Sequence, residues 1–117
     1  MKKVLVVSPR KLSTYGANIR RDLVERLNNS EIKTSFPSKK NLGHLLVSCD
    51  AVLVLEATLE GSAMFAARLA LELNRPVLAT PGSIFRYASQ GTNLLIQNGA
   101  HLVTKYQDVV DFLIMID

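Results

Sequence analysis

The chain has 117 residues, of which 48% are hydrophobic and 21% charged, and this composition is typical of a globular domain. Its one cysteine, Cys49, excludes an internal disulfide, and its two distant histidines, His44 and His101, lack the spacing of a metal site. No apolar run approaches the length of a membrane span and the first residues do not resemble a signal peptide, so we expect a cytoplasmic protein without membrane association, metal or cofactor.

Strand and helix patterns alternate along the whole chain. Short apolar runs predict strands at residues 4–7, 32–36, 51–55, 76–79 and 101–103. Helical spacing predicts helices at residues 16–29, 41–49, 62–74, 92–98 and from 106 to the end. Apolar strands separated by helices are typical of a parallel sheet that is covered on both faces. We therefore predict a single domain over residues 1–117, an α/β three-layer sandwich with a mainly parallel sheet of about five strands.

Polar residues and glycines gather in the loops that follow the predicted strands, namely residues 8–16, 36–41, 56–62 and 80–91. Ligands of such sheets bind beyond the carboxyl ends of the strands. Residues 1–40 also contain ten lysines and arginines against three acidic residues, whereas residues 41–117 contain four against seven. This asymmetry favours a basic face with an anionic partner, although lysines that merely solvate a small domain give the same count.

Two of these loops contain the lysines and the arginine that we expect at the carboxyl ends of the strands. In the first loop, hydroxyls and two cations precede a helix N-terminus, a combination that suits a phosphate group. The second loop has two lysines ahead of a short helix. A capped helix start and a solvated loop are the alternative interpretations. The candidates in the two loops are Ser8, Arg10, Lys11, Lys39, Lys40 and Asn41.

The segment 81–103 carries the most informative pattern. A strand-end Pro-Gly leads into a polar loop, and a Gly-Thr stands at the predicted start of the next helix, where free backbone N–H groups would offer a seat for an anion. The long helix that starts near residue 62 also opens with small residues, which allow close approach of a ligand to the backbone. The candidates in these two places are Gly61, Ser62, Ser83, Arg86, Gly91 and Thr92.

Glu56 follows the third predicted strand. A carboxylate in this position could act as a nucleophile or a base, but no second carboxylate, histidine or lysine stands at the spacing that such chemistry needs. We therefore expect no catalytic residue in this chain. Glu56 is interpreted as structural, accepting hydrogen bonds from backbone N–H groups of the loop that follows it.

The last predicted helix is more apolar than one contact with its own sheet requires. Its apolar stripe is made of Val109, Phe112, Leu113 and Ile116. The surplus suggests burial against a second subunit, so we expect a homodimer. A helix wedged between the sheet and the first helix is the alternative.

Several of these motifs resemble those of one family, the DprA/Smf DNA-processing proteins. The matching features are PGSIFRYASQGTNLLIQNGAHLV from Pro81, an Asp-Ala…Glu-Ala frame that ends at Ala57, and Arg10 followed by Tyr15-Gly16. The resemblance is close over residues 50–113 and moderate over residues 3–27. It implies a Rossmann-like fold.

The resemblance is incomplete in two places. The family has a Phe-Pro followed by an Arg-Asn-Arg element that contacts the DNA backbone; here Phe36-Pro37 is present, Lys40-Asn41 replaces the first two residues of that element and Leu42 the third. About ten residues also bridge a region where the family has a second strand, a Ser-Gly-Leu-Ala-Arg-Gly-Ile-Asp block, another helix and a further strand. The resemblance therefore implies a minimal member, without the family's flanking domains and without part of its sheet.

The resemblance implies single-stranded DNA binding and a role in loading a RecA-type recombinase during natural transformation. Phosphate contacts would fall to Arg10, Lys39, Lys40 and Arg86, and the aromatic residues that could stack bases are Tyr15, Phe36, Phe85 and Tyr87. Two other classes stay open: a nucleotide-binding sensor or nucleotide-processing enzyme of the wider fold group, and an oligomerisation module that binds no DNA.

Overall fold

The computed structural model describes residues 2–9 and 11–116. Its strands are β1 (Lys3–Val7), β2 (Lys33–Ser35), β3 (Ala51–Val54), β4 (Val77–Ala79) and β5 (His101–Leu102). Its helices are α1 (Thr14–Asn29), α2 (Leu42–Ser48), α3 (Ser62–Glu72), α4 (Gln90–Gln97) and α5 (Tyr106–Met115), with a 3₁₀ turn at Tyr87–Ser89 ahead of α4. Every predicted strand and helix is present.

The five strands form one parallel sheet in the order β2-β1-β3-β4-β5. The chain therefore builds the sheet outward from β1 in one direction to β2 and in the other to β3, β4 and β5. A crevice opens beyond the carboxyl ends of the strands at such a switch point. The predicted Rossmann-like α/β fold is confirmed. In this topology the crevice lies between the loops that follow β1 and β3.

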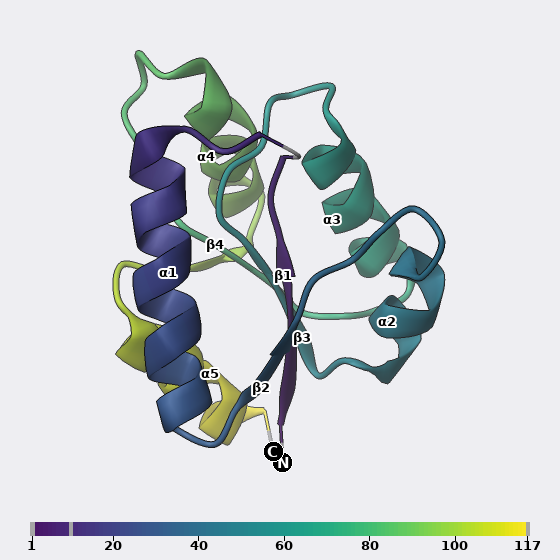
Figure 1. Cartoon of the computed structure of the whole chain (residues 1–117). Helices are drawn as coiled ribbons and strands as arrows, with labels where there is room; N and C mark the ends of the chain where they lie inside the picture. The colour runs from purple at the N-terminus through teal and green to yellow at the C-terminus, as the bar shows by residue number, and fades with distance from the viewer. Residues whose placement is uncertain (1, 10, 117) are drawn as a thin grey trace.

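The sheet separates two hydrophobic cores, because successive side chains of a strand point to opposite faces. Figure 1 shows α1 and α5 on one side of the sheet and α2 and α3 on the other. Val4 and Val6 of β1 pack with Leu23 and Leu27 of α1, whereas Leu5 and Val7 belong to the core on the α2, α3 and α4 side. The strands are buried on both faces, which is why they read as continuous apolar runs.

The apolar stripe of α5 is divided between the core and the surface. Val109 and Leu113 are buried in the core that α5 shares with α1, so the expectation that these two residues face a second subunit is wrong. Phe112 is half-buried against the same core, with its ring 4.8 Å from that of His101. The exposed apolar side chains at this end of the molecule are Leu102, Ile114, Met115 and Ile116.

The first turn of α5 is fixed by Asp108. Its carboxylate accepts hydrogen bonds from the backbone N–H of Thr104 at 2.8 Å, from the Thr104 hydroxyl at 3.0 Å and from the backbone N–H of Lys105 at 3.3 Å. The backbone hydrogen bond from Thr104 is the main reason why the pKa of Asp108 lies below its usual value. These contacts belong to a capping box that fixes the chain at the start of α5, just after β5.

Cys49 ends α2 and is buried, as its position predicted. Burial raises the pKa of its thiol, and the nearby Arg75 only partly offsets this effect. The thiolate fraction is therefore small at neutral pH, which makes this cysteine a poor nucleophile. Within residues 2–9 and 11–116, no helix has the length and apolar character needed to cross a membrane.

Candidate functional site

A groove of about 730 Å³ lies at the edge of the sheet where the strands end. Three segments form it: the end of β1 with Ser8, the loop between β2 and α2, and the first two turns of α3. These segments are far apart in the sequence, and the switch from β2 to β3 around β1 brings them together. The groove includes the predicted site residues Ser8, Lys39 and Ser62.

The N-terminus of α3 faces this groove without a compensating side chain. Gly61 is the N-cap and supplies no side-chain hydrogen bond, and the first turn contains no acidic residue. The first backbone N–H groups of a helix lack partners within the helix and attract negative charge. A Cβ at Gly61 would lie 2.5 Å from the Thr58 hydroxyl oxygen, so a larger residue there would require the Thr58 side chain to move.

One lysine lines the groove, and two further lysines are exposed in loops after the strands. Lys39 lines it, and Lys11 and Lys40 are exposed in loops at the same edge. Asn41 is exposed as well, but its side-chain oxygen accepts a hydrogen bond from the backbone N–H of Ser38 and so holds the loop before α2. Among the described residues, the cation that lines the groove is therefore Lys39. Arg10 lies outside the described residues.

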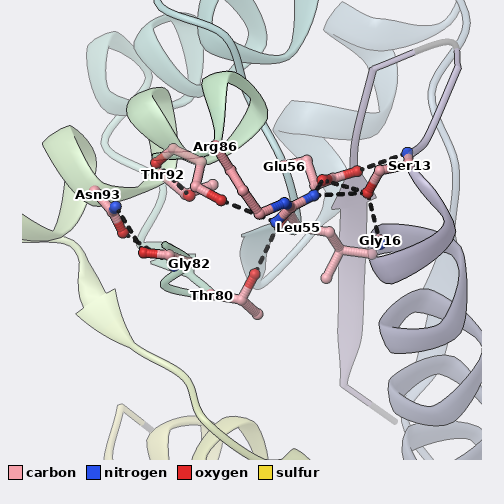
Figure 2. A network of polar contacts seen from close by, with 10 residues as sticks. Ser13, Gly16, Leu55, Glu56, Thr80, Gly82, Arg86, Thr92 and Asn93 are labelled. Carbon is pink, nitrogen blue, oxygen red and sulfur yellow. Dashed lines mark hydrogen bonds and ion pairs between the residues drawn. The ribbon is translucent and has the colours of Figure 1, made fainter. Parts of the chain in front are cut away.

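A polar network occupies the neighbouring part of the edge, around the carboxylate of Glu56 (Figure 2). Glu56 is buried directly after β3 and accepts hydrogen bonds from the backbone N–H of Ser13 at 3.1 Å and from its hydroxyl at 2.8 Å. The hydroxyl of Ser13 in turn accepts from the backbone N–H of Gly16 and so caps α1. The structural role expected for Glu56 is therefore present, but its backbone partner is the loop before α1, not the loop after β3.

Arg86 completes this network. Its guanidinium forms an ion pair with Glu56 and donates to the hydroxyls of Ser13 at 2.7 Å and Ser89 at 3.0 Å. It also lies over the ring of Tyr15, 4.5 Å from the ring centre. The Arg86 side chain is 27% exposed and that of Glu56 is 2% exposed. The expected phosphate contact of Arg86 thus competes with a buried carboxylate, and the arginine serves to tie the loop after β4 to the loop after β1 (Figure 2).

Backbone contacts hold the rest of this loop in place. The side chain of Asn93 bonds both the N–H and the C=O of Gly82, at 3.1 and 3.0 Å (Figure 2). Gly91 is buried and donates its N–H to the carbonyl of Ala57 at 2.7 Å, and the buried Thr92 donates its hydroxyl to the carbonyl of Ser89. The expected free N–H of Gly91 is therefore absent from the structure, since α4 begins at Gln90 and the glycine packs directly on the end of β3.

Sequence reasoning missed three residues of this network, Ser13, Ser89 and Asn93. A signal for the ion pair was present, because Arg86 is the one charged residue in the fully described segment 80–92 and Glu56 is a carboxylate at the end of a buried strand. The remaining candidate, Ser83, is exposed, and its hydroxyl accepts from the backbone N–H of Phe85 at 3.1 Å. In the part of the chain that the structure describes, no three histidine, cysteine or acidic side chains lie close enough to hold a metal ion.

Comparison with known proteins gives a consistent match. The family model described as DNA recombination-mediator protein A matches residues 45–114. The DNA processing protein DprA of Streptococcus pneumoniae is 38% identical over 79 residues, which are 68% of this chain and 27% of that protein. The protein Smf of Escherichia coli is 44% identical over 60 residues, which are 51% of this chain and 16% of that protein.

The structural comparison extends the likeness to nearly the whole chain. The structure titled "Structural insights into the unique single-stranded DNA binding mode of DNA processing protein A from Helicobacter pylori" superposes with a TM-score of 0.80, over 97% of this chain and 80% of that one. The sequence identity is 18%, so this match shows a shared fold. The chain spans about a quarter of the S. pneumoniae protein and about a sixth of the E. coli one.

Proposed function

This chain belongs to the DNA recombination-mediator protein A family and is similar to DprA and Smf, and we propose that it binds single-stranded DNA at the carboxyl edge of its sheet. The observation that carries the proposal is the groove between β1, α2 and α3, which combines Lys39 with the uncapped N-terminus of α3. Both features attract phosphate groups. The H. pylori protein of the same fold is described as binding single-stranded DNA.

The proposed role is one of binding without catalysis, in the loading of a RecA-type recombinase during natural transformation. The family description, a recombination mediator, supports the recombinase as a partner. Glu56 is the carboxylate that could act as a nucleophile or a base in an enzyme of this fold. Its oxygens already accept hydrogen bonds from Ser13 and Arg86. We propose that the single domain over residues 1–117 carries the DNA-binding surface.

The test is the binding of a fluorescein-labelled oligo(dT) strand, followed by anisotropy across a series of salt concentrations. The double variant Lys39→Ala/Lys40→Ala is expected to bind more weakly and to have a less steep salt dependence. Each lysine that neutralises a phosphate contributes about −0.7 to the slope of log K against log salt for single strands. Losing both is therefore expected to reduce the slope by up to about 1.4.

The matched control is Lys3→Ala/Lys33→Ala, which removes the same charge from the opposite edge. These exposed lysines are paired in register at the amino ends of β1 and β2. The control is expected to keep the wild-type slope. If both double variants reduced the affinity and the slope equally, binding would depend on the overall charge of the protein and not on the groove. Failure of the wild-type protein to bind the strand at low salt would contradict the proposal and favour the nucleotide-binding or oligomerisation classes.

We also propose a homodimer that uses the exposed apolar side chains beside β5 and along the end of α5. Sedimentation at tens of micromolar is expected to give a dimer for the wild-type chain. Leu102→Ser/Ile114→Ser is expected to give a folded monomer, because both side chains are exposed and neither belongs to a core cluster. A monomeric wild-type protein at these concentrations would contradict the proposal.

A further inference from the structure

The carboxyl edge has a second half that the lysine groove does not include. It is built by the loop after β4, and its most exposed side chains are apolar or aromatic: Phe85 is 92% exposed, and Ile84 and Tyr87 are exposed beside it. Tyr15, from the first turn of α1, adds an exposed ring that lies under the Arg86 guanidinium. A ring as exposed as that of Phe85 costs solvation free energy unless a ligand covers it.

This half of the edge carries little net charge. Arg86 is the one charged residue of segment 80–92, and its ion pair with the buried Glu56 offsets its charge. The other half, in contrast, presents Lys39 in the groove and the exposed Lys40 next to it in the chain. The edge therefore has a cationic side and a neutral aromatic side, joined through the contact of Ser13 with Arg86.

The aromatic loop is held rigidly although its tip is exposed. Gly82 is fixed by Asn93, Ala88 accepts from the backbone N–H of Ala57 at 2.9 Å, and Arg86 is bonded on both sides of its guanidinium. The backbone N–H of Arg86 also closes a turn onto the carbonyl of Ser83 at 3.1 Å. Binding to a ring presented in this way loses little conformational entropy, which is the advantage of preorganisation.

We propose that this aromatic side, Tyr15, Phe85 and Tyr87, stacks with the bases of the bound single strand while the lysine side holds its phosphates. The inference rests on the proposed function, and it assigns an orientation to the strand across the edge. A nucleotide chain has a charged backbone on one side and flat aromatic bases on the other, so the two halves of the edge match its two sides. Arg86 is a positioning residue in this arrangement, because it holds Tyr15 and the loop that bears Phe85.

The contributions of base stacking and phosphate binding to affinity can be distinguished, because only phosphate contacts make the binding constant depend on salt concentration. Replacing Phe85 by alanine is expected to weaken oligo(dT) binding by about 5-fold to 150-fold, the range for loss of one base–aromatic stack. The slope of log K against log salt is expected to stay at the wild-type value, because no phosphate contact is lost. An oligonucleotide of abasic sites is expected to bind the wild-type protein and Phe85→Ala equally. Leu71→Ala, an exposed apolar residue at the far end of α3, is the control and is expected to change neither quantity.

A direct readout is available because the chain contains no tryptophan. In Phe85→Trp the single indole is expected to lose fluorescence on addition of oligo(dT), and to keep it with the abasic strand or when placed at Leu71→Trp. Wild-type binding of oligo(dT) with an unquenched indole in Phe85→Trp and an unchanged affinity of Phe85→Ala would overturn this inference and leave the proposed function intact. Absence of wild-type binding to any strand would overturn both.

Discussion

Replacing Glu56 by alanine is expected to lower the free energy of unfolding by about 3 kcal/mol, measured by urea denaturation followed by circular dichroism. The change removes the acceptor of three hydrogen bonds and leaves the Arg86 guanidinium and the Ser13 hydroxyl without their buried partner. Removing one member of a buried ion pair costs about 3–5 kcal/mol because the remaining charge stays desolvated. The partial exposure of Arg86 places the expected cost at the lower end of that range.

The control for this prediction is Asp22→Ala, which breaks the exposed ion pair between Asp22 and Arg26 on α1. An exposed pair of this kind contributes less than about 1 kcal/mol. The double variant Glu56→Leu/Arg86→Met is expected to recover part of the loss of Glu56→Ala, since an apolar pair leaves no buried charge uncompensated. A cost for Glu56→Ala no larger than that for Asp22→Ala would contradict the interpretation of Glu56 as the residue that joins the two loops.

The same network explains which features of the site the sequence could predict. The alternation of strands and helices predicted that loops 8–16 and 80–91 meet at one edge, because parallel strands bring their carboxyl ends together. The state of Arg86 did not follow from that alternation. Its partner Glu56 lies 30 residues away in the sequence, and only the packed structure shows that Arg86 turns inward to the carboxylate. The alternation of strands and helices alone does not distinguish an exposed cation from a paired one.

The C-terminal helix illustrates the same difference. Its excess of apolar residues was evident in the sequence, and helical spacing identified one stripe. Which members of that stripe face the protein's own sheet depends on the rotation of the helix about its axis, which the packed structure shows and the periodicity does not. Val109 and Leu113 fill the core as a result, and the apolar surface shifts to Leu102, Ile114 and Met115. Hydrophobic periodicity predicts that such a helix is present more reliably than it predicts which of its sides packs against the sheet.

Gly91→Ala is expected to destabilise the protein by about 1–3 kcal/mol, the cost of forcing an extra methyl group into a packed site. A Cβ at this position would lie 2.5 Å from the carbonyl oxygen of Ala57 and 2.7 Å from its Cβ. The obstacle includes the backbone of Ala57, in the loop after β3, so no side-chain rotation relieves it. The hydrogen bond from the Gly91 N–H to the same carbonyl, 2.7 Å long, would be lengthened as the helix moves away.

Gly43→Ala is the matched control, because Gly43 lies in α2 and an added Cβ there would contact nothing within 4 Å. Alanine is expected to stabilise α2 by about 0.4–1 kcal/mol through its helix propensity and the lower entropy of the unfolded chain. The two changes are chemically identical and their expected signs are opposite. If Gly91→Ala were neutral in urea denaturation but weakened DNA binding, the glycine would serve an anion and not the packing of α4. A lower free energy of unfolding, with the wild-type slope of log K against log salt for DNA binding, would assign Gly91 to the packing of α4 on the loop after β3.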